Sequence, residues 1–206
     1  GRGRNSPSRP VGRPRGAWHR GVALVKGFDM ASAARRDRLV IGNRRYSSWS
    51  LRGWLAVKLA GLDVEVELIP FTRPGSTPAI AALSPNGLVP YLEHGGARVW
   101  ESLAIGEYCA EFAPALWPEE RIARAEARAI AAEMHAGFRG LRQNMWMNLG
   151  RDFAYAAAGK GRVPEALADI ARIETLWADA RTRFSAGGPY LFGATFTLAD
   201  AMFAPV

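Results

Sequence analysis

Glu101 and Ser102 are the two side chains whose types and position point most directly to binding chemistry. They precede an apolar run with helical spacing, formed by Ile105, Tyr108, Cys109 and Phe112. Ser102 is predicted to cap the N-terminus of that helix, where free N–H groups attract a carboxylate. The adjacent Glu101 offers a negative charge to an ammonium group. The pair could therefore bind the head group of an α-amino acid, although a capping serine beside a solvated glutamate is the simpler alternative.

The loop before this pair supplies a second binding feature. Residues 84–87, Ser-Pro-Asn-Gly, are turn formers, and residues 89–93 predict a strand that Pro90 opens without loss of a ladder donor. Residues 94–97 predict a hairpin turn, and residues 98–100 predict the return strand. The Val89–Pro90 bond is a candidate cis peptide, which would turn the backbone N–H and C=O of Val89 toward an extended ligand. The segment is therefore suited to docking a peptide.

These two features together carry a family resemblance. The pattern S-P-x-G-x-V-P-x-L followed by E-S-L-A-I-x-E-Y resembles the glutathione-binding segment of the glutathione S-transferase superfamily. The resemblance implies that the backbone of Val89, before Pro90, pairs with the cysteinyl part of glutathione. It also implies that Glu101 and Ser102 hold the γ-glutamyl end. The matching motifs cover about residues 39–112 and a later capping box.

The elements that must position this segment are readable from the hydrophobic pattern. Residues 38–42 predict a buried strand, residues 43–50 a polar loop, and residues 64–70 a second strand. The helix between them is predicted to turn one apolar face inward, formed by Leu51, Trp54, Leu55, Leu59 and Leu62. A short helix is expected over residues 77–83. Strand, helix and strand followed by hairpin and helix predict a four-stranded mixed sheet, which is the thioredoxin-like layout that the resemblance implies.

The second half of the sequence predicts helices alone. One follows Pro118 with apolar residues at Ala123, Ala127, Ile130, Met134 and Phe138. Another spans residues 164–184 through Leu167, Ile170, Ile173, Leu176 and Trp177. Thr197 and Asp200 form a capping box that opens a further helix. The expected fold class is α+β, with a thioredoxin-like glutathione-binding domain over residues 38–113 and an all-helical domain over residues 118–206. Because the family normally has further helices after the capping box, we expect this helical domain to be truncated.

Hydroxyl groups before the first helix could activate a thiol. Lowering a thiol pKa by about two units takes about 2.7 kcal/mol, and one hydrogen bond to the thiolate at a helix N-terminus supplies about that amount. The run Ser-Ser-Trp-Ser-Leu-Arg at residues 47–52 resembles the zeta-class signature S-S-C-S-W-R of the superfamily. This resemblance to a bacterial zeta-like subgroup implies that Ser47 is catalytic. Ser48 is then a second donor and Ser50 the helix cap, with Tyr46 as an alternative activating residue.

The resemblance implies a glutathione S-transferase that attacks an electrophilic small molecule, in the manner of detoxification enzymes. Trp49 stands where the zeta class has a cysteine associated with cis-trans isomerisation of maleylacetoacetate, so that isomerisation is kept as an alternative. A non-catalytic interaction module with the same fold is another. Candidate residues of the electrophile site, expected between the two domains, are Arg139, Arg142, Asn144 and Trp146. Packing and solvated arginines would also explain these four residues.

The charge is unevenly distributed along the chain. Residues 1–38 carry ten basic and two acidic residues, whereas residues 39–206 are formally neutral, so the folded part has no basic excess for nucleic acid. Residues 1–37 form a predicted disordered leader rich in Arg, Pro and Gly. It resembles a transit peptide or a nucleic-acid-binding arm, but we favour sequence upstream of an ordinary start at Met30.

The remaining composition narrows the expected compartment and partners. A single cysteine excludes an internal disulfide and a cysteine-rich zinc site, and no metal cofactor is expected. No apolar run approaches the roughly 20 residues needed to span a membrane. We therefore expect a soluble, cytoplasmic protein. Glutathione as co-substrate and an electrophile are its expected partners, and the resemblance adds a homodimer.

Overall fold

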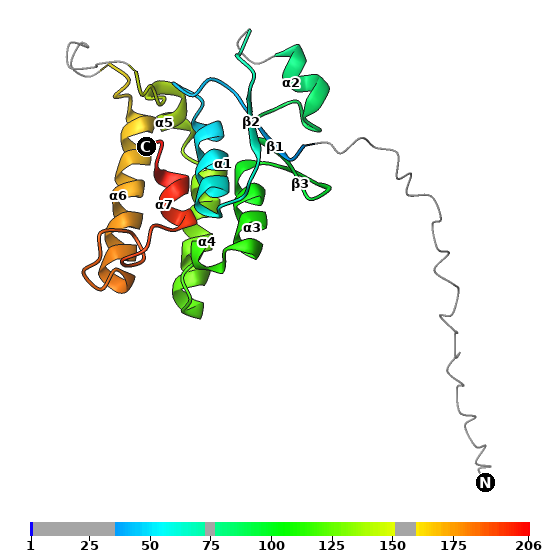
Figure 1. The fold of residues 1–206 in the computed structure, drawn as a ribbon. Coiled ribbons are helices and arrows are strands. Elements are labelled where there is room, and N and C mark those ends of the chain that lie inside the picture. The colour runs from blue at the N-terminus through cyan, green and yellow to red at the C-terminus, as the bar shows by residue number, and fades with distance from the viewer. Residues whose placement is uncertain (2–35, 73–76, 151–159) are drawn as a thin grey trace. The chain divides into compact units, whose positions relative to one another are not determined.

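The structure, a computed structural model, describes residue 1 and residues 36–72, 77–150 and 160–206 (Figure 1). Residues 36–206 form one compact unit. The leader predicted over residues 1–37 lies almost entirely outside the described residues. The domain boundary predicted between residues 113 and 118 stays a prediction.

A four-stranded mixed sheet forms the first part of this unit. Its strands are β1 (Arg38–Ile41), β2 (Glu65–Leu68), β3 (Tyr91–His94) and β4 (Ala97–Trp100), arranged in the order β2-β1-β3-β4. β1 pairs in parallel with β2 and antiparallel with β3, and β3 pairs antiparallel with β4. The continuous apolar run of β1 suits its central place, where Leu39 and Val40 are fully buried. The predicted sheet is confirmed.

Arg38 stabilises the sheet at the start of β1. Its Nε donates to Glu93 Oε2 at 2.8 Å and its Nη1 donates to Glu67 Oε2 at 2.9 Å. These carboxylates lie on the two strands that flank β1, so one guanidinium links three strands. The hydrogen bond to Glu93 and the charges of both carboxylates raise the pKa of Arg38.

Three helices accompany the sheet: α1 (Ser48–Leu59), α2 (Pro78–Leu83) and α3 (Ser102–Phe112). Helices α1 and α3 pack on each other, and Figure 1 shows α2 on the other side of the strands. The predicted apolar face of α1 is partly wrong, because Leu59 is exposed and the fully buried apolar positions are Gly53, Ala56 and Val57. The small side chains at these positions let α1 approach its neighbours closely. The prediction followed the large apolar residues, which lie on a different face of the helix.

The helical part comprises a short 3₁₀ helix, Pro114–Leu116, followed by α4 (Arg121–Ala136), α5 (Arg139–Asn144), α6 (Pro164–Phe184) and α7 (Leu198–Phe203). The bounds predicted for α6 are confirmed, although its Leu167 is exposed. The capping box of α7 is also confirmed, since Asp200 Oδ2 accepts hydrogen bonds from both the N–H and the hydroxyl of Thr197.

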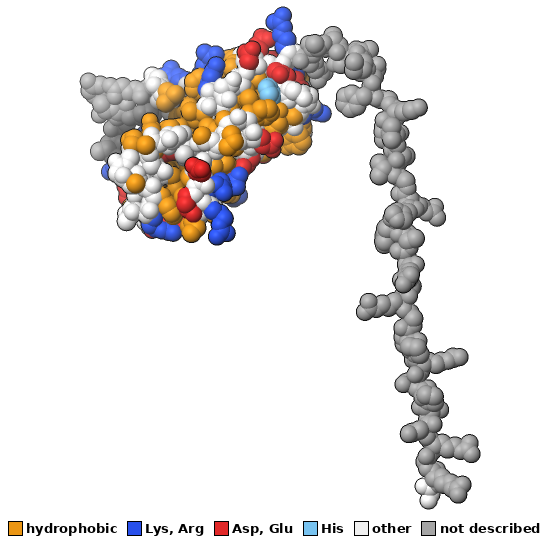
Figure 2. Space-filling model, turned by 60° about the horizontal axis from the view of Figure 1, so that its bottom comes forward, with side chains coloured by type: hydrophobic (Ala, Val, Ile, Leu, Met, Phe, Trp, Pro, Cys, Tyr) orange, Lys and Arg blue, Asp and Glu red, His pale blue; other side chains and the backbone are white. Residues whose placement is uncertain are grey.

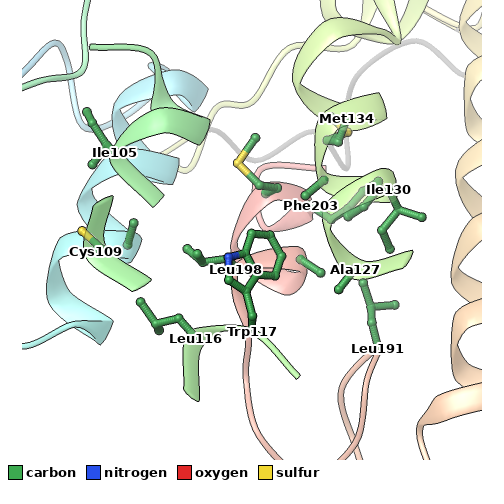
Figure 3. Close-up of a cluster of buried hydrophobic side chains, with 14 of the residues drawn as sticks. Ile105, Cys109, Leu116, Trp117, Ala127, Ile130, Met134, Leu191, Leu198 and Phe203 are labelled. Atoms are coloured by element: carbon green, nitrogen blue, oxygen red, sulfur yellow. The ribbon is translucent and has the colours of Figure 1, made fainter. Parts of the chain in front are cut away.

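A single hydrophobic core joins the sheet to these helices. Figure 3 shows Leu198 and Phe203 of α7 between the side chains of α3, such as Cys109, and those of α4, such as Ile130. The core predictions for Cys109 and for the buried face of α4 are confirmed, but Phe112 at the end of α3 is exposed. Helix α7 thus joins α3 to α4 in the core.

The surface of the described residues is mixed in character. Figure 2 shows acidic, basic and hydrophobic side chains intermingled on one face. Within the described ranges, no helix is both long and apolar enough to cross a membrane.

Candidate functional site

A cleft of about 1010 Å³ brings together half of the residues that the sequence singled out. Ser47 lines it from the start of α1, Val89 and Pro90 line it from the loop before β3, and Glu101 lines it from the start of α3. The Val89–Pro90 peptide bond is cis, as predicted. Trp146 closes part of the wall from the segment after α5. Ser47 and Trp146, about 100 positions apart in the sequence, thus line the same cleft.

Ser47, not Ser50, caps α1, so this part of the prediction was wrong. The Ser47 hydroxyl oxygen accepts a hydrogen bond from the backbone N–H of Ser50 at 3.4 Å. Ser50 lies one turn inside the helix, where its Oγ accepts the N–H of Gly42 at 2.9 Å. The Ser47 hydroxyl donates to Ser50 Oγ at 2.8 Å. Ser50 Oγ therefore links the end of β1 to the hydroxyl that lines the cleft, because it accepts a hydrogen bond from each.

Glu101 has an unusual backbone conformation for a residue with a side chain. Its φ of 70° lies in the left-handed region, and it occupies the N-cap position of α3, where Ser102 had been predicted. Ser102 is instead the first residue of the helix and is buried. Asn86 Nδ2 donates to Glu101 Oε1 at 2.9 Å, and Asn86 Oδ1 accepts the N–H of Leu88. Asn86 therefore links the loop before Pro90 to the carboxylate predicted to bind the ligand.

His135 of α4 reaches the same carboxylate from the helical part, which the sequence did not reveal. Its Nε2 lies 3.6 Å from Glu101 Oε2 and its Nδ1 lies 3.5 Å from Ser102 Oγ. Burial lowers the pKa of His135, the charges of Arg142 and Arg52 lower it further, and Glu101 opposes them. His135 reaches Glu101 because α4 packs against α3.

Trp49 contacts His135 as well as two arginines, Arg52 and Arg142. The edge of its ring meets the His135 ring, with centroids 5.3 Å apart. The guanidinium carbons of Arg52 and Arg142 lie 5.1 Å and 4.3 Å from the centre of its ring. Trp49 is therefore packed among three nitrogen-rich side chains.

Arg45 holds the segment after α5 over the cleft. Its Nε donates to Asn148 Oδ1 at 2.9 Å, its Nη2 donates to the carbonyl oxygen of Gly150, and its own carbonyl oxygen accepts the N–H of Leu149. Trp146, which lies in this segment, lines the cleft together with Trp49. The loop before α1 thus holds the segment that contains one of the predicted electrophile-site residues.

The other predicted site residues are divided among separate places. Ser48 and Arg142 line a smaller cavity on the far side of Trp49 from Ser47. Arg139 and Asn144 line a shallow hollow between α5 and α6, away from the cleft. Tyr46, the alternative activating residue, lines the cleft beside Ser47, and its ring centre lies 6.1 Å from that of Phe71.

A second hollow of about 1010 Å³ lies between α3, α4 and the loop before α7. Two of its charged side chains, Arg128 and Glu107, pair with each other at 3.1 Å. It contains none of the residues that the sequence analysis predicted to bind or react. Within residues 36–72, 77–150 and 160–206, no group of three or more His, Cys, Asp or Glu side chains is arranged to hold a metal ion.

Comparison with known proteins now identifies the architecture. Residues 46–111 match the family model described as the glutathione S-transferase N-terminal domain. The theta-class glutathione S-transferase of Xanthomonas axonopodis pv. citri with glutathione bound is 29% identical, with a TM-score of 0.53 over 80% of this chain and 78% of that chain. The fold is that of the glutathione S-transferases.

Two further structures with this fold are more distant in sequence. An epsilon-class glutathione S-transferase from the housefly Musca domestica is 19% identical, with a TM-score of 0.59 over 82% of this chain and 75% of that chain. A glutathione transferase homologue from Burkholderia with bound glutathione is 22% identical, with a TM-score of 0.57 over 82% of this chain and 78% of that chain. No curated protein matches the sequence.

Within this glutathione S-transferase fold, the cleft holds no protein thiol. Cys109 is the sole cysteine of the chain, and it is fully buried in α3. Burial raises the pKa of its thiol to about 12. A reactive sulfur in the cleft would therefore have to come from a ligand.

Proposed function

We propose that the protein is a glutathione transferase of a bacterial zeta-like type, which activates the thiol of bound glutathione for attack on an electrophilic small molecule. The observation that carries this proposal is the convergence of Ser47, the Val89 backbone and Glu101 on one cleft. The relatives from Xanthomonas and Burkholderia with glutathione bound support glutathione as the co-substrate.

The serine pair gives a physical route to a lowered thiol pKa. The Gly42 N–H and the Ser47 hydroxyl both donate to Ser50 Oγ in this structure. Rotation of the two hydroxyls would reverse the second hydrogen bond, so that Ser50 donates to Ser47 Oγ. The Ser47 hydroxyl is then free to donate its proton toward a thiolate in the cleft. A thiolate is the stronger acceptor because it is charged, so it favours this direction of the chain over the reverse. Ser50 rather than Ser48 supports Ser47 in this arrangement.

Glutathione would be held at its two ends. Glu101, oriented by Asn86 and His135, supplies the negative charge for the ammonium of the γ-glutamyl group. Ser102 contributes its backbone N–H as the first residue of α3, where the helix dipole favours the carboxylate. The backbone of Val89 pairs with the cysteinyl part, as the resemblance implies.

Addition or substitution fits this site better than isomerisation through a protein thiol. In either reaction the glutathione sulfur supplies the electron pair for the new carbon–sulfur bond. The thiol proton leaves to solvent, and the electron pair displaced from the electrophile goes to its leaving group or to its conjugated acceptor. Trp49 has no sulfur to offer, and Cys109 lies in the core.

The test follows the ultraviolet absorbance of the glutathione thiolate against pH in the wild-type complex and in the Ser47→Ala, Ser48→Ala and Ser50→Ala complexes. We expect the thiol pKa to fall by about two units in the wild type and to return toward its free value in Ser47→Ala. Ser48→Ala should behave as the wild type because its side chain lines the other cavity. Ser50→Ala should fall between them.

Two results would overturn this proposal. If the glutathione thiol pKa in Ser47→Ala were the same as in the wild type, another group would activate the thiol, and Tyr46 would be the next residue to test. Failure of the wild type to bind glutathione would remove the activity altogether and leave a non-catalytic module with this fold.

A further inference from the structure

His135 lies beside both residues that are proposed to hold the γ-glutamyl group. Its Nε2 is 3.6 Å from Glu101 Oε2, and its Nδ1 is 3.5 Å from Ser102 Oγ. The ring belongs to α4, in the helical part, and it also meets the ring of Trp49 on α1, with centroids 5.3 Å apart. A titratable side chain from the helical part therefore reaches the start of α3, where the ligand's ammonium and carboxylate are expected.

The two carboxylate oxygens of Glu101 have different neighbours. Oε1 accepts a hydrogen bond from Asn86 Nδ2 at 2.9 Å, whereas Oε2 faces His135 Nε2. Glu101 is exposed and lines the cleft, so a ligand can reach its carboxylate. Because Asn86 takes up Oε1, the ammonium of a ligand is expected to meet Oε2. That is the oxygen that His135 faces.

The surroundings of His135 permit both charge states of its ring. An imidazolium donates from both nitrogens, and the Glu101 carboxylate and the Ser102 hydroxyl oxygen can both accept. Burial lowers the pKa of His135, the charge of Glu101 opposes this, and the charges of Arg142 on α5 and Arg52 on α1 lower the pKa further. Within the described ranges, these three are the charged groups that act on the ring. The ring is therefore neutral at neutral pH and takes up its proton only as the pH falls below 6.5.

We propose that His135 is a pH switch for glutathione binding: the neutral imidazole leaves Glu101 to the ligand's ammonium, and the imidazolium competes with that ammonium for the same carboxylate. This inference rests on the proposed function, because it takes glutathione to bind at Glu101. It adds that acidification weakens the hold on glutathione. By linkage, glutathione binding in this acidic range releases a proton from His135.

The same positive charge also has an effect of opposite sign. An imidazolium beside Ser102 would attract the carboxylate of the γ-glutamyl group. That carboxylate, however, would be held by backbone N–H groups and the dipole of α3, which do not change with pH in this range. The ammonium depends on the charge of Glu101, so the loss at Glu101 exceeds the gain at Ser102. A ligand without the ammonium separates the two effects.

The experiment measures ligand affinity by titration calorimetry at about pH 7.5 and about pH 5.5, on either side of the ordinary histidine pKa. The first ligand is S-methylglutathione, which has no thiol to ionise, so thiol activation by Ser47 does not affect the result. The second is its des-amino analogue, in which a hydrogen atom replaces the ammonium group. The proteins are the wild type, His135→Gln and the matched control His94→Gln, which alters the histidine at the other end of β3, outside the cleft. Circular dichroism verifies that each protein is folded at both pH values.

We expect the affinity of the wild type and of His94→Gln for S-methylglutathione to fall about fivefold from the higher to the lower pH. This is the size expected for a charge pair that is partly exposed to solvent. In His135→Gln the fall should be less than about twofold, because glutamine carries no charge at either pH. The des-amino analogue should bind the wild type no more weakly at the lower pH, since it keeps the carboxylate and lacks the ammonium.

Three results would each overturn the switch while S-methylglutathione still binds at the higher pH, which keeps the proposed function. They are a wild-type affinity for S-methylglutathione that does not fall with pH, an equal fall in His135→Gln, and an equal fall for the des-amino analogue. The analogue is compared on the wild type alone, so this test holds even if His135→Gln does not fold. A wild type that binds no S-methylglutathione at either pH would overturn the switch together with the proposed function.

Discussion

Replacement of Arg52 by methionine should make the protein more stable, because it removes a buried and unpaired charge. Burial, together with the charge of Arg142, lowers the pKa of Arg52 from 12.5 to about 9. At 1.36 kcal/mol for each pKa unit, this corresponds to about 5 kcal/mol of unfavourable free energy at neutral pH. Methionine has a similar length and no charge, so it relieves this cost.

Two favourable interactions are lost in the same substitution. The hydrogen bond from Arg52 Nε to the Met202 carbonyl oxygen contributes about 1.5 to 3 kcal/mol, and the contact with the Trp49 ring about 1 kcal/mol. The net expectation is that the free energy of unfolding rises by about 1 to 2 kcal/mol. For a protein of this size that is a rise in Tm of about 2 to 8 °C.

Urea unfolding followed by circular dichroism measures the change, with Arg139→Met as the control. Since Arg139 is exposed, its substitution should change the free energy of unfolding by no more than about 0.5 kcal/mol. If Arg52→Met were instead less stable than the wild type by more than about 1 kcal/mol, Arg52 would have a stabilising partner and the reasoning for an unpaired charge would fail.

The pH dependence gives an independent check on the same charge. Because the folded state holds the Arg52 proton less tightly than the unfolded state, the penalty is fully present below about pH 9 and is relieved as the pH rises toward 12.5. The stability difference between Arg52→Met and the wild type should therefore shrink by about 1.4 kcal/mol between neutral pH and about pH 10. A difference that did not change with pH would contradict the lowered pKa.

Two further substitutions test how the cleft is built. A Cβ on Gly53 would lie 2.7 Å from the rigid ring of Pro90, so Gly53→Ala should weaken glutathione binding severalfold, whereas Gly106→Ala, which meets only the mobile end of Leu198 at 3.2 Å, should not. Equal affinities from titration calorimetry would refute that packing argument. Burial lowers the pKa of His135, so the unfolded state binds the proton more readily than the folded state. The wild type should therefore lose stability as the pH falls below 6.5, and His135→Gln should remove this loss. Parallel Tm profiles of the two proteins across this range would argue against a buried neutral imidazole beside Glu101.

Features that depend on neighbours in the sequence were predicted well. The strand β1 is a continuous apolar run, the capping box of α7 is a local exchange of hydrogen bonds between Thr197 and Asp200, and the bounds of α6 follow from Pro164 and its helical spacing. The cleft residues from Ser84 to Ser102 could be anticipated for the same reason, since a short segment with strong turn chemistry allows few conformations.

The errors arose where packing overrides local preference. Ser47 and Ser50 could each cap α1, and the N–H of Gly42 on the neighbouring strand end decided the matter by binding Ser50. The apolar face of α1 was misjudged because its close approach to Pro90 requires the small Gly53. The spacing of hydrophobic residues does not show where a contact needs a small side chain.

The sequence by itself determined the order of the elements, the thioredoxin-like pattern, and the hydroxyl and carboxylate groups that a glutathione site requires. Only the tertiary structure decided that His135 stands beside Glu101, and that Arg52 and Arg142 share Trp49. The physical reason is that these contacts join residues from α1, α3, α4 and α5, and their formation depends on how the helices pack on one core. The burial of Arg52 Nη1 without a hydrogen-bond partner in the described part of the chain likewise results from that packing and cannot be read from the sequence.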